Sequence, residues 1–190
     1  MDVKAKDFIR EYRRSDADGR LDLMLNHYGI FPRIIRMLER RTKYKIKTER
    51  ERLVSKARGE LGVRIQKSDI SKPTEEEAVA NVTMDEAFET GKIDPSILKG
   101  IESSDEYAAD IRIISIMKMD FDLLSDSIDA LGAEDSEWIK EYFNKEKLLK
   151  EIALDQDKSY DAMKKRLVRL RADLRDAVID CLEMNCQGGE

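Results

Sequence analysis

The amino-acid sequence predicts an all-α protein, with an N-terminal helical bundle or dimerisation body followed by a C-terminal helix-turn-helix module. Apolar residues recur at steps of three and four over long stretches, and residues that start or stop helices flank these stretches. Charged residues make up 39% of the 190 residues and apolar residues 41%, whereas an average soluble domain has roughly 25% charged residues. Such a composition is typical of helices with one buried face and strongly solvated outer faces.

The first predicted segment, residues 1–60, is an N-terminal basic helical segment that carries an apolar stripe followed by a basic run. Gly29 and Pro32 interrupt the stripe, and because proline lacks the N–H that an interior helical turn needs, we expect a kink or a new helix near Pro32. Helical spacing then continues to about Arg58 and should end at the glycine that follows it. The residues of the stripe are Leu21, Met24, Tyr28, Phe31, Ile35 and Leu38.

The second segment, residues 61–100, is predicted to hold a linker and short helices. Residues 59–73 contain glycines, a proline and a short apolar alternation, which favours a linker with room for one extended stretch. Thr74 and Glu77 have the spacing of a capping box, so a helix should begin there and continue to about Glu89.

The third segment, residues 101–132, has the most regular apolar spacing in the chain. Ser103 and Glu106 form another capping-box pattern, and Gly132 closes the segment. We interpret its apolar seam as core, with a dimer interface as the alternative, so that the helix is a core or dimerisation helix. The seam residues are Tyr107, Ile111, Ile114, Met117, Phe121, Leu124, Ile128 and Leu131.

The fourth segment, residues 133–190, is predicted to form the helix-turn-helix domain. A helix from about Ser136 carries aromatic residues, and a very short helix follows from Leu148 to Ile152. After a polar break, Ser159 should cap a long helix. The apolar face of that helix consists of Met163, Leu167, Leu170, Leu174, Val178 and Leu182.

The net charge of −5 is unevenly distributed along the chain. An acidic middle, residues 69–141, separates a basic run at Arg33–Arg58 from a second basic segment at Lys145–Arg175. The Arg33–Arg58 run is either a second DNA-contacting surface or an electrostatic partner of the acidic middle. We favour the electrostatic partner.

No pattern in the sequence indicates an enzyme, a metal site or a bound cofactor. The only histidine, His27, is expected to be a surface or packing residue. Cys181 and Cys186 are the only cysteines, so the chain has too few Cys and His residues for a zinc site. We interpret neighbouring carboxylates such as Asp120 and Asp122 as members of solvated helix faces. No signal peptide or membrane-spanning run is evident, so we expect a soluble cytoplasmic protein with reduced thiols.

The segment around Ser159 predicts DNA binding. In a helix-turn-helix a small residue in the first helix lets the second helix cross closely, and Ile152 with Ala153 meets this need, while Met163 and Leu167 would point inward. Arg166 and Arg175 are ranked lower because they can pair with local carboxylates. The predicted DNA-binding residues are Lys150, Lys158, Ser159, Tyr160, Lys164, Lys165, Arg169 and Arg171.

The alternative for this segment is a charged antiparallel helix pair without a ligand. Gln156, Asp157 and Lys158 distinguish the two, because the turn of a helix-turn-helix normally has apolar and glycine-like residues at these positions. A sharp turn there favours a DNA reader, whereas a helix that continues through these residues favours a merely charged helix.

Residues 138–178 resemble region four of RNA polymerase sigma factors. The block GVRIQKSDISKPTEEEAV and the long helix before Trp138 resemble phage late transcription regulators of the RinA/ArpU type. The resemblance implies a sequence-specific regulator of phage or prophage late or packaging genes that binds double-stranded DNA in the bacterial host cell and contacts host RNA polymerase. The matching motif residues are Leu149, Glu151, Ile152, Ala153, Ser159, Met163, Arg166, Leu167 and Arg169.

A protein of a different class is the competing prediction. It is a phage-borne helical interaction or inhibitor module that uses its acidic middle to occupy a basic surface on a partner protein. Binding to duplex DNA that weakens steeply with salt would distinguish the regulator from this module.

Overall fold

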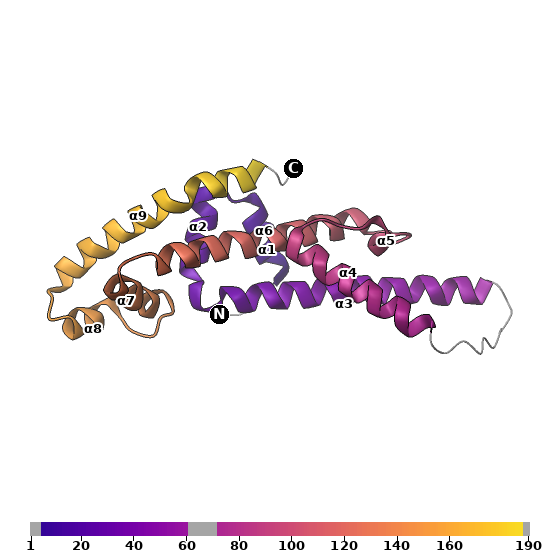
Figure 1. Cartoon of the computed structure of the whole chain (residues 1–190), viewed down its shortest axis with the longest axis horizontal. Helices are drawn as coiled ribbons and strands as arrows, with labels where there is room; N and C mark the ends of the chain where they lie inside the picture. Colours follow the sequence, from indigo (N-terminus) through magenta and orange to yellow (C-terminus); the bar gives the residue numbers. More distant parts are fainter. Residues whose placement is uncertain (1–4, 61–71, 188–190) are drawn as a thin grey trace. The chain divides into compact units, whose positions relative to one another are not determined.

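The computed structural model describes residues 5–60 and 72–187, with side chains described for residues 7–56 and 79–186. Every regular element in these residues is helical, which confirms the predicted all-α class (Figure 1). The elements are α1 (Ala5–Arg14), α2 (Ala17–Asn26), the 3-10 turn η1 (Tyr28–Ile30), α3 (Phe31–Glu60), α4 (Lys72–Thr90), α5 (Pro95–Leu98), α6 (Ser104–Asp129), α7 (Ala133–Phe143), α8 (Leu149–Asp155) and α9 (Tyr160–Gln187).

The chain divides into two compact units. Unit 1 contains the residues up to Ile35 together with those from Met117 onward, and unit 2 contains Arg36–Ile116. Unit 1 therefore joins the start of the chain to its last third. Most of the linker predicted at residues 59–73 lies outside the described residues.

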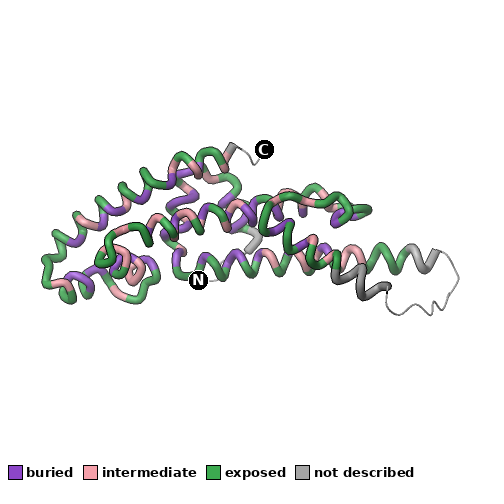
Figure 2. Tube along the Cα trace, viewed as in Figure 1, coloured by how far each residue is buried: buried purple, intermediate pink, exposed green. Residues whose placement is uncertain are grey.

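Unit 1 is built around aromatic residues from helices far apart in sequence. The Phe31 ring stacks on Phe121 with centroids 5.2 Å apart, and Tyr28 lies between Phe121 and Phe143 at 5.3 and 6.1 Å. Helix α9 packs along α2 and buries the predicted apolar face from Leu170 to Leu182 (Figure 2). Burial of large aromatic and aliphatic side chains is the main source of stability in such a core.

The first helix of unit 1 was not predicted. Phe8, Ile9 and Tyr12 are all buried, and their spacing places them on one face of α1. Asp16 then caps α2 by accepting a hydrogen bond from the Gly19 N–H at 2.9 Å. The prediction of a fresh helix near Pro32 is confirmed, because Pro32 lies in the first turn of α3, where its missing N–H costs nothing.

Unit 2 combines the rest of α3 with α4, α5 and the first half of α6. Phe88 and Ile46 are fully buried in it, and Ser115 donates a hydrogen bond to the Glu89 carbonyl at 3.2 Å. Gly91 ends α4 with a φ of 71°, a conformation that suits glycine. Tyr107 donates a 2.5 Å hydrogen bond to Glu49.

The apolar seam of α6 is largely buried within the protein. Its residues up to Ile114 belong to unit 2 and those from Met117 onward to unit 1, and Phe121 is half-buried. The seam therefore contributes to the chain's own core.

Candidate nucleic-acid interface

The chain turns between α8 and α9. Gln156 ends α8 with its N–H bonded to the Ile152 carbonyl at 3.1 Å, and the Lys158 N–H bonds to the Ala153 carbonyl at 2.9 Å. Asp157 takes a left-handed conformation with a φ of 51°. These are the features of a helix C-terminus closed by a left-handed residue. The alternative in which one helix continues through Gln156–Lys158 is therefore wrong.

Local capping starts both helices of this pair. The Leu148 N–H donates to the Glu151 carboxylate at 2.6 Å, which satisfies a backbone donor at the start of α8. The Ser159 hydroxyl accepts from the Ala162 N–H at 3.2 Å, as predicted for the cap of the long helix.

The predicted inward positions of the pair are buried. Ile152 and Ala153 are 1% and 3% exposed, and Met163 and Leu167 are 0% and 7% exposed. Helix α8 packs against both α7 and α9. A small residue at Ala153 is consistent with this close approach, because a larger side chain would hold the helices further apart.

Five of the predicted DNA-binding residues are exposed, one in the first turn of α8 and four in the first three turns of α9. Lys164, Lys165 and Arg169 are exposed, and none of them forms an ion pair with another residue of known placement. Tyr160 is 44% exposed, and the Lys150 ammonium lies 5.9 Å from the centroid of its ring. Residues three or four apart on a helix are neighbours. Tyr160, Lys164, Lys165 and Arg169 therefore form a continuous surface on α9.

The other three predicted residues have intramolecular partners. Lys158 donates to Glu134 at 2.9 Å, and Arg171 lies 3.7 Å from Asp22. Ser159 uses its hydroxyl oxygen as the helix cap. These three contacts hold the side chains within unit 1.

The two arginines that were ranked lower do pair with carboxylates. Arg166 contacts Glu134 at 3.0 Å and Asp135 at 2.7 Å, and Arg175 makes a two-pronged contact with Asp18 at 2.6 and 3.0 Å. Hydrogen bonds from Lys158 and Arg166 lower the pKa of Glu134.

Exposed apolar residues beside the basic surface were not predicted. Leu154 is 80% exposed at the end of α8, and Val168 is 62% exposed between Lys165 and Arg169. Val168 falls outside the buried α9 face, and this departure from the spacing is the only sign of its position in the sequence. Val168 therefore places an apolar side chain among the exposed cations Lys164, Lys165 and Arg169.

A buried polar cluster in unit 1 corrects one interpretation of the sequence. Asp120, expected on a solvated face, is 0% exposed. Its carboxylate accepts hydrogen bonds from Tyr12 at 2.7 Å and from Asn185 at 2.6 Å, and lies 3.6 Å from Arg20. Burial raises the pKa of Asp120, while these hydrogen bonds and Arg20 oppose the rise. The interpretation was wrong because the helices that cover Asp120 come from distant parts of the chain.

Arg20 is the least satisfied member of this cluster. It is 2% exposed, and its Nε and Nη1 atoms find no hydrogen-bond acceptor among the residues that the structure describes. Its guanidinium also lies 5.1 Å from the centre of the Tyr12 ring. A buried charge with so few partners depends strongly on the one carboxylate beside it.

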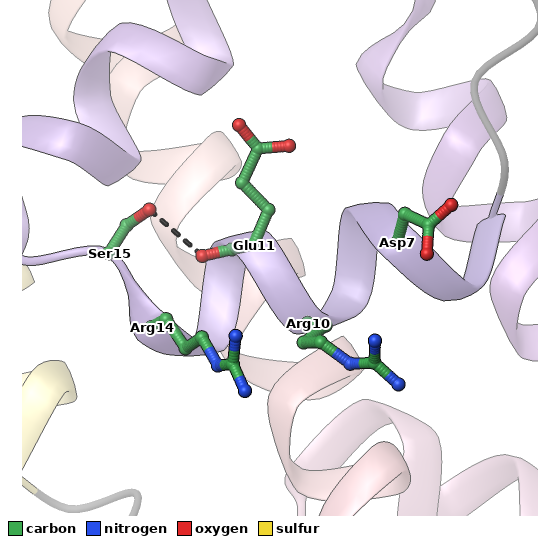
Figure 3. A pocket seen from close by; sticks show the side chains of 5 residues that line it. All are labelled: Asp7, Arg10, Glu11, Arg14 and Ser15. Atoms are coloured by element: carbon green, nitrogen blue, oxygen red, sulfur yellow. Dashed lines mark hydrogen bonds between the residues drawn. The ribbon is translucent and has the colours of Figure 1, made fainter.

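A shallow pocket lies on α1, lined by Asp7, Arg10, Glu11, Arg14 and Ser15 (Figure 3). The close-up shows the Glu11 side chain extending away from those of Arg10 and Arg14, and Ser15 donating to the Glu11 carbonyl at 2.9 Å. All the lining residues come from one helix and its end, and their charges have both signs. The pocket therefore lacks a set of groups converging on one point.

The described residues include neither a membrane-spanning helix nor a metal-binding cluster. They contain no helix with the length and apolar character of a membrane span. Nor do they contain a group of three or more His, Cys, Asp or Glu side chains arranged to hold a metal ion.

Comparison of the chain with protein-family models, curated proteins and solved structures finds no match.

Proposed function

We propose that this protein is a sequence-specific DNA-binding transcription regulator in which α8 and α9 act as a helix-turn-helix. The left-handed turn at Asp157 is the observation that carries the proposal, because it lets α9 start in a new direction with its first turns exposed. In helix-turn-helix proteins the start of the second helix contacts base edges in the major groove.

The charges at the start of α9 support this role. Lys164, Lys165 and Arg169 have no carboxylate partner among the described residues, so phosphates can take up their charge. Tyr160 supplies a hydroxyl for a base edge or sugar, and Val168 an apolar contact suited to a thymine methyl group. Phosphate contacts from Lys164, Lys165 and Arg169 would fix the register of the helix. Tyr160 and Val168 would add sequence preference.

The resemblance to phage late transcription regulators gives the proposal its biological setting. The DNA target would lie upstream of late or packaging genes of a phage or prophage, in the bacterial host cell. Host RNA polymerase and a second copy of the chain are the protein partners in this proposal.

Selection of bound fragments from a genomic DNA pool at low and moderate salt tests the proposal. Wild-type protein should enrich a common sequence at both salt concentrations. A plot of log affinity against log salt has a negative slope, to which each phosphate contact contributes about −0.9. Replacing Lys164 and Lys165 with glutamine should therefore make the slope less steep by about 1.8.

A matched control uses Lys92→Gln with Lys99→Gln, which removes the same charge from exposed positions of unit 2. This control should leave the slope close to wild type. Absence of duplex binding at low salt, with a stable protein complex recovered in its place, would overturn the proposal and favour the acidic interaction module.

A further inference from the structure

The cations of α3 within unit 2 fall into two groups with different electrostatic roles. The first group has partners: Lys43 binds Glu39 and Asp85, Lys45 lies 5.7 Å from the centroid of the Tyr107 ring, and Arg50 donates to the Ser96 carbonyl at 2.9 Å. The Lys43–Asp85 ion pair fits the interpretation of the basic run as an electrostatic partner of the acidic middle.

The second group has no ion-pair partner among the described residues. Arg36, Arg40 and Arg41 are exposed and form no ion pair with any residue that the structure places. Tyr44 follows them and is 72% exposed. We call these four residues the α3 basic face. The acidic middle thus satisfies only part of the basic run.

Helix geometry makes the α3 basic face continuous. Arg36, Arg40 and Tyr44 follow one another in steps of four, and Arg41 lies three positions before Tyr44, so each residue neighbours the next. From Arg36 to Tyr44 the helix rises about 12 Å. A DNA duplex presents roughly three to four phosphates per strand over that length.

The described carboxylates of α3 do not neutralise this surface. Between residues 36 and 56, Glu51 is the exposed acidic residue, while Glu39 contacts Lys43 and Glu49 accepts the hydrogen bond from Tyr107. Like charges four apart on a helix destabilise it, so unpaired arginines at Arg36 and Arg40 do not serve stability. They are suited to a ligand that brings negative charge.

The chemistry of the face identifies the kind of ligand. Arginine forms two parallel hydrogen bonds with a phosphate, and a row of arginines along a helix matches a repeating anion better than a single small one. An exposed tyrosine beside them donates a hydrogen bond to a phosphate or sugar oxygen. A phosphodiester backbone meets both requirements.

We propose that the α3 basic face binds the phosphate backbone of duplex DNA and supplies sequence-independent affinity. The choice of duplex DNA rests on the proposed function, in which α9 reads the same class of ligand. The α3 face carries no sequence information, because its contacts go to phosphates and sugars.

Anisotropy of a labelled duplex, titrated with full-length protein over a salt series, tests the inference. Arg40→Gln with Arg41→Gln should make the salt dependence of affinity less steep by about 1.8, on the selected sequence and on a random duplex alike. Between 50 and 200 mM salt this amounts to about a tenfold smaller loss of affinity than wild type shows. Circular dichroism should report unchanged helix content.

Two matched variants separate the inference from the proposed function. Arg10→Gln with Arg14→Gln removes the same charge from α1 and should leave the slope unchanged. In α9, Tyr160→Phe with Val168→Ala should weaken the preference for the selected sequence, whereas the α3 variant should preserve it.

The outcomes are distinguishable. If the α3 variant behaves like the α1 control while the α9 variant weakens the preference for the selected sequence, the inference is wrong and the proposed function stands. If only the α3 variant lowers the slope and no sequence is preferred, the inference stands and the proposed function is wrong. Binding of an acidic protein without any binding of duplex DNA overturns both.

Discussion

Neutralising Asp120 should destabilise unit 1 by about 3–5 kcal/mol, the usual cost of breaking a buried ion pair by removing one partner. Asparagine at this position keeps the volume and an acceptor for the 2.7 Å hydrogen bond from Tyr12. It removes the negative charge 3.6 Å from Arg20 and also the second acceptor oxygen, which accepts the 2.6 Å hydrogen bond from Asn185. Because Arg20 is 2% exposed and already has two unsatisfied nitrogen atoms, water cannot replace the lost partner.

A second substitution separates the charge from the packing. Arg20→Met removes the buried cation with little loss of apolar contact. Asp120→Asn with Arg20→Met leaves no buried charge in this cluster, so the double variant should be more stable than Asp120→Asn alone. Double-mutant cycles on contacting residues give coupling energies of about 0.5–3 kcal/mol, and we expect a value in the upper half of that range.

Tryptophan fluorescence during urea unfolding measures this effect in the right part of the molecule. Trp138 is the only tryptophan, it is 2% exposed, and it belongs to unit 1 with the cluster. Its signal should therefore follow the unfolding of unit 1. If Asp120→Asn unfolds within about 0.5 kcal/mol of wild type, or if the two single effects simply add, the charge argument is wrong.

Two further predictions concern unit 1. Burial and the neighbouring Asp120 raise the pKa of Tyr12 well above its ordinary value near 10. The folded state thus holds the phenol proton more tightly, and stability present below pH 10 should fall by about 1.4 kcal/mol per pH unit above it. Tyr12→Phe should remove this loss from urea titrations followed by Trp138; an unchanged alkaline slope would contradict the assignment. Separately, a Cβ on Gly29 would lie 3.2 Å from the Asn144 Cα, so Gly29→Ala should cost about 1–3 kcal/mol. Gly132→Ala, which meets no atom within 4 Å, should stay within about 0.5 kcal/mol in the same thermal-unfolding assay; equal effects would refute the packing argument.

Most helices follow from local patterns, because their causes lie within a few residues. The capping residue Ser159 and the stop at Gly91 are examples, since each acts on the helix next to it. Helix α1 escaped prediction because its many charged residues obscure a short apolar pattern at Phe8, Ile9 and Tyr12. Only packing against distant helices makes that pattern decisive.

The partners of individual charges cannot be predicted in the same way. Tyr12 and Asp120 are 108 positions apart, and Lys158 and Glu134 are 24 apart. A sequence shows how many cations a helix has, but their availability to a ligand depends on such distant carboxylates. For this reason Lys158 and Lys164 look alike in the sequence and differ in the structure.

The turn between α8 and α9 lies between these two cases. Aspartate adopts the left-handed conformation more readily than most residues, but far less readily than glycine. The sequence therefore leaves both a turn and a continuous helix open at Asp157. Packing of Ile152 and Ala153 against α9 adds the contacts that favour the turn.

Helix α9 is one continuous helix whose apolar face is buried along most of its length. Its later turns, from Leu170 to Leu182, pack against α2, while Met163 and Leu167 in the turns around Lys164 are buried where α9 packs against α8. The direction of the turns around Lys164 is therefore set during folding, before any ligand arrives. A partner that binds them meets a preorganised surface, and the entropy lost on association is correspondingly smaller.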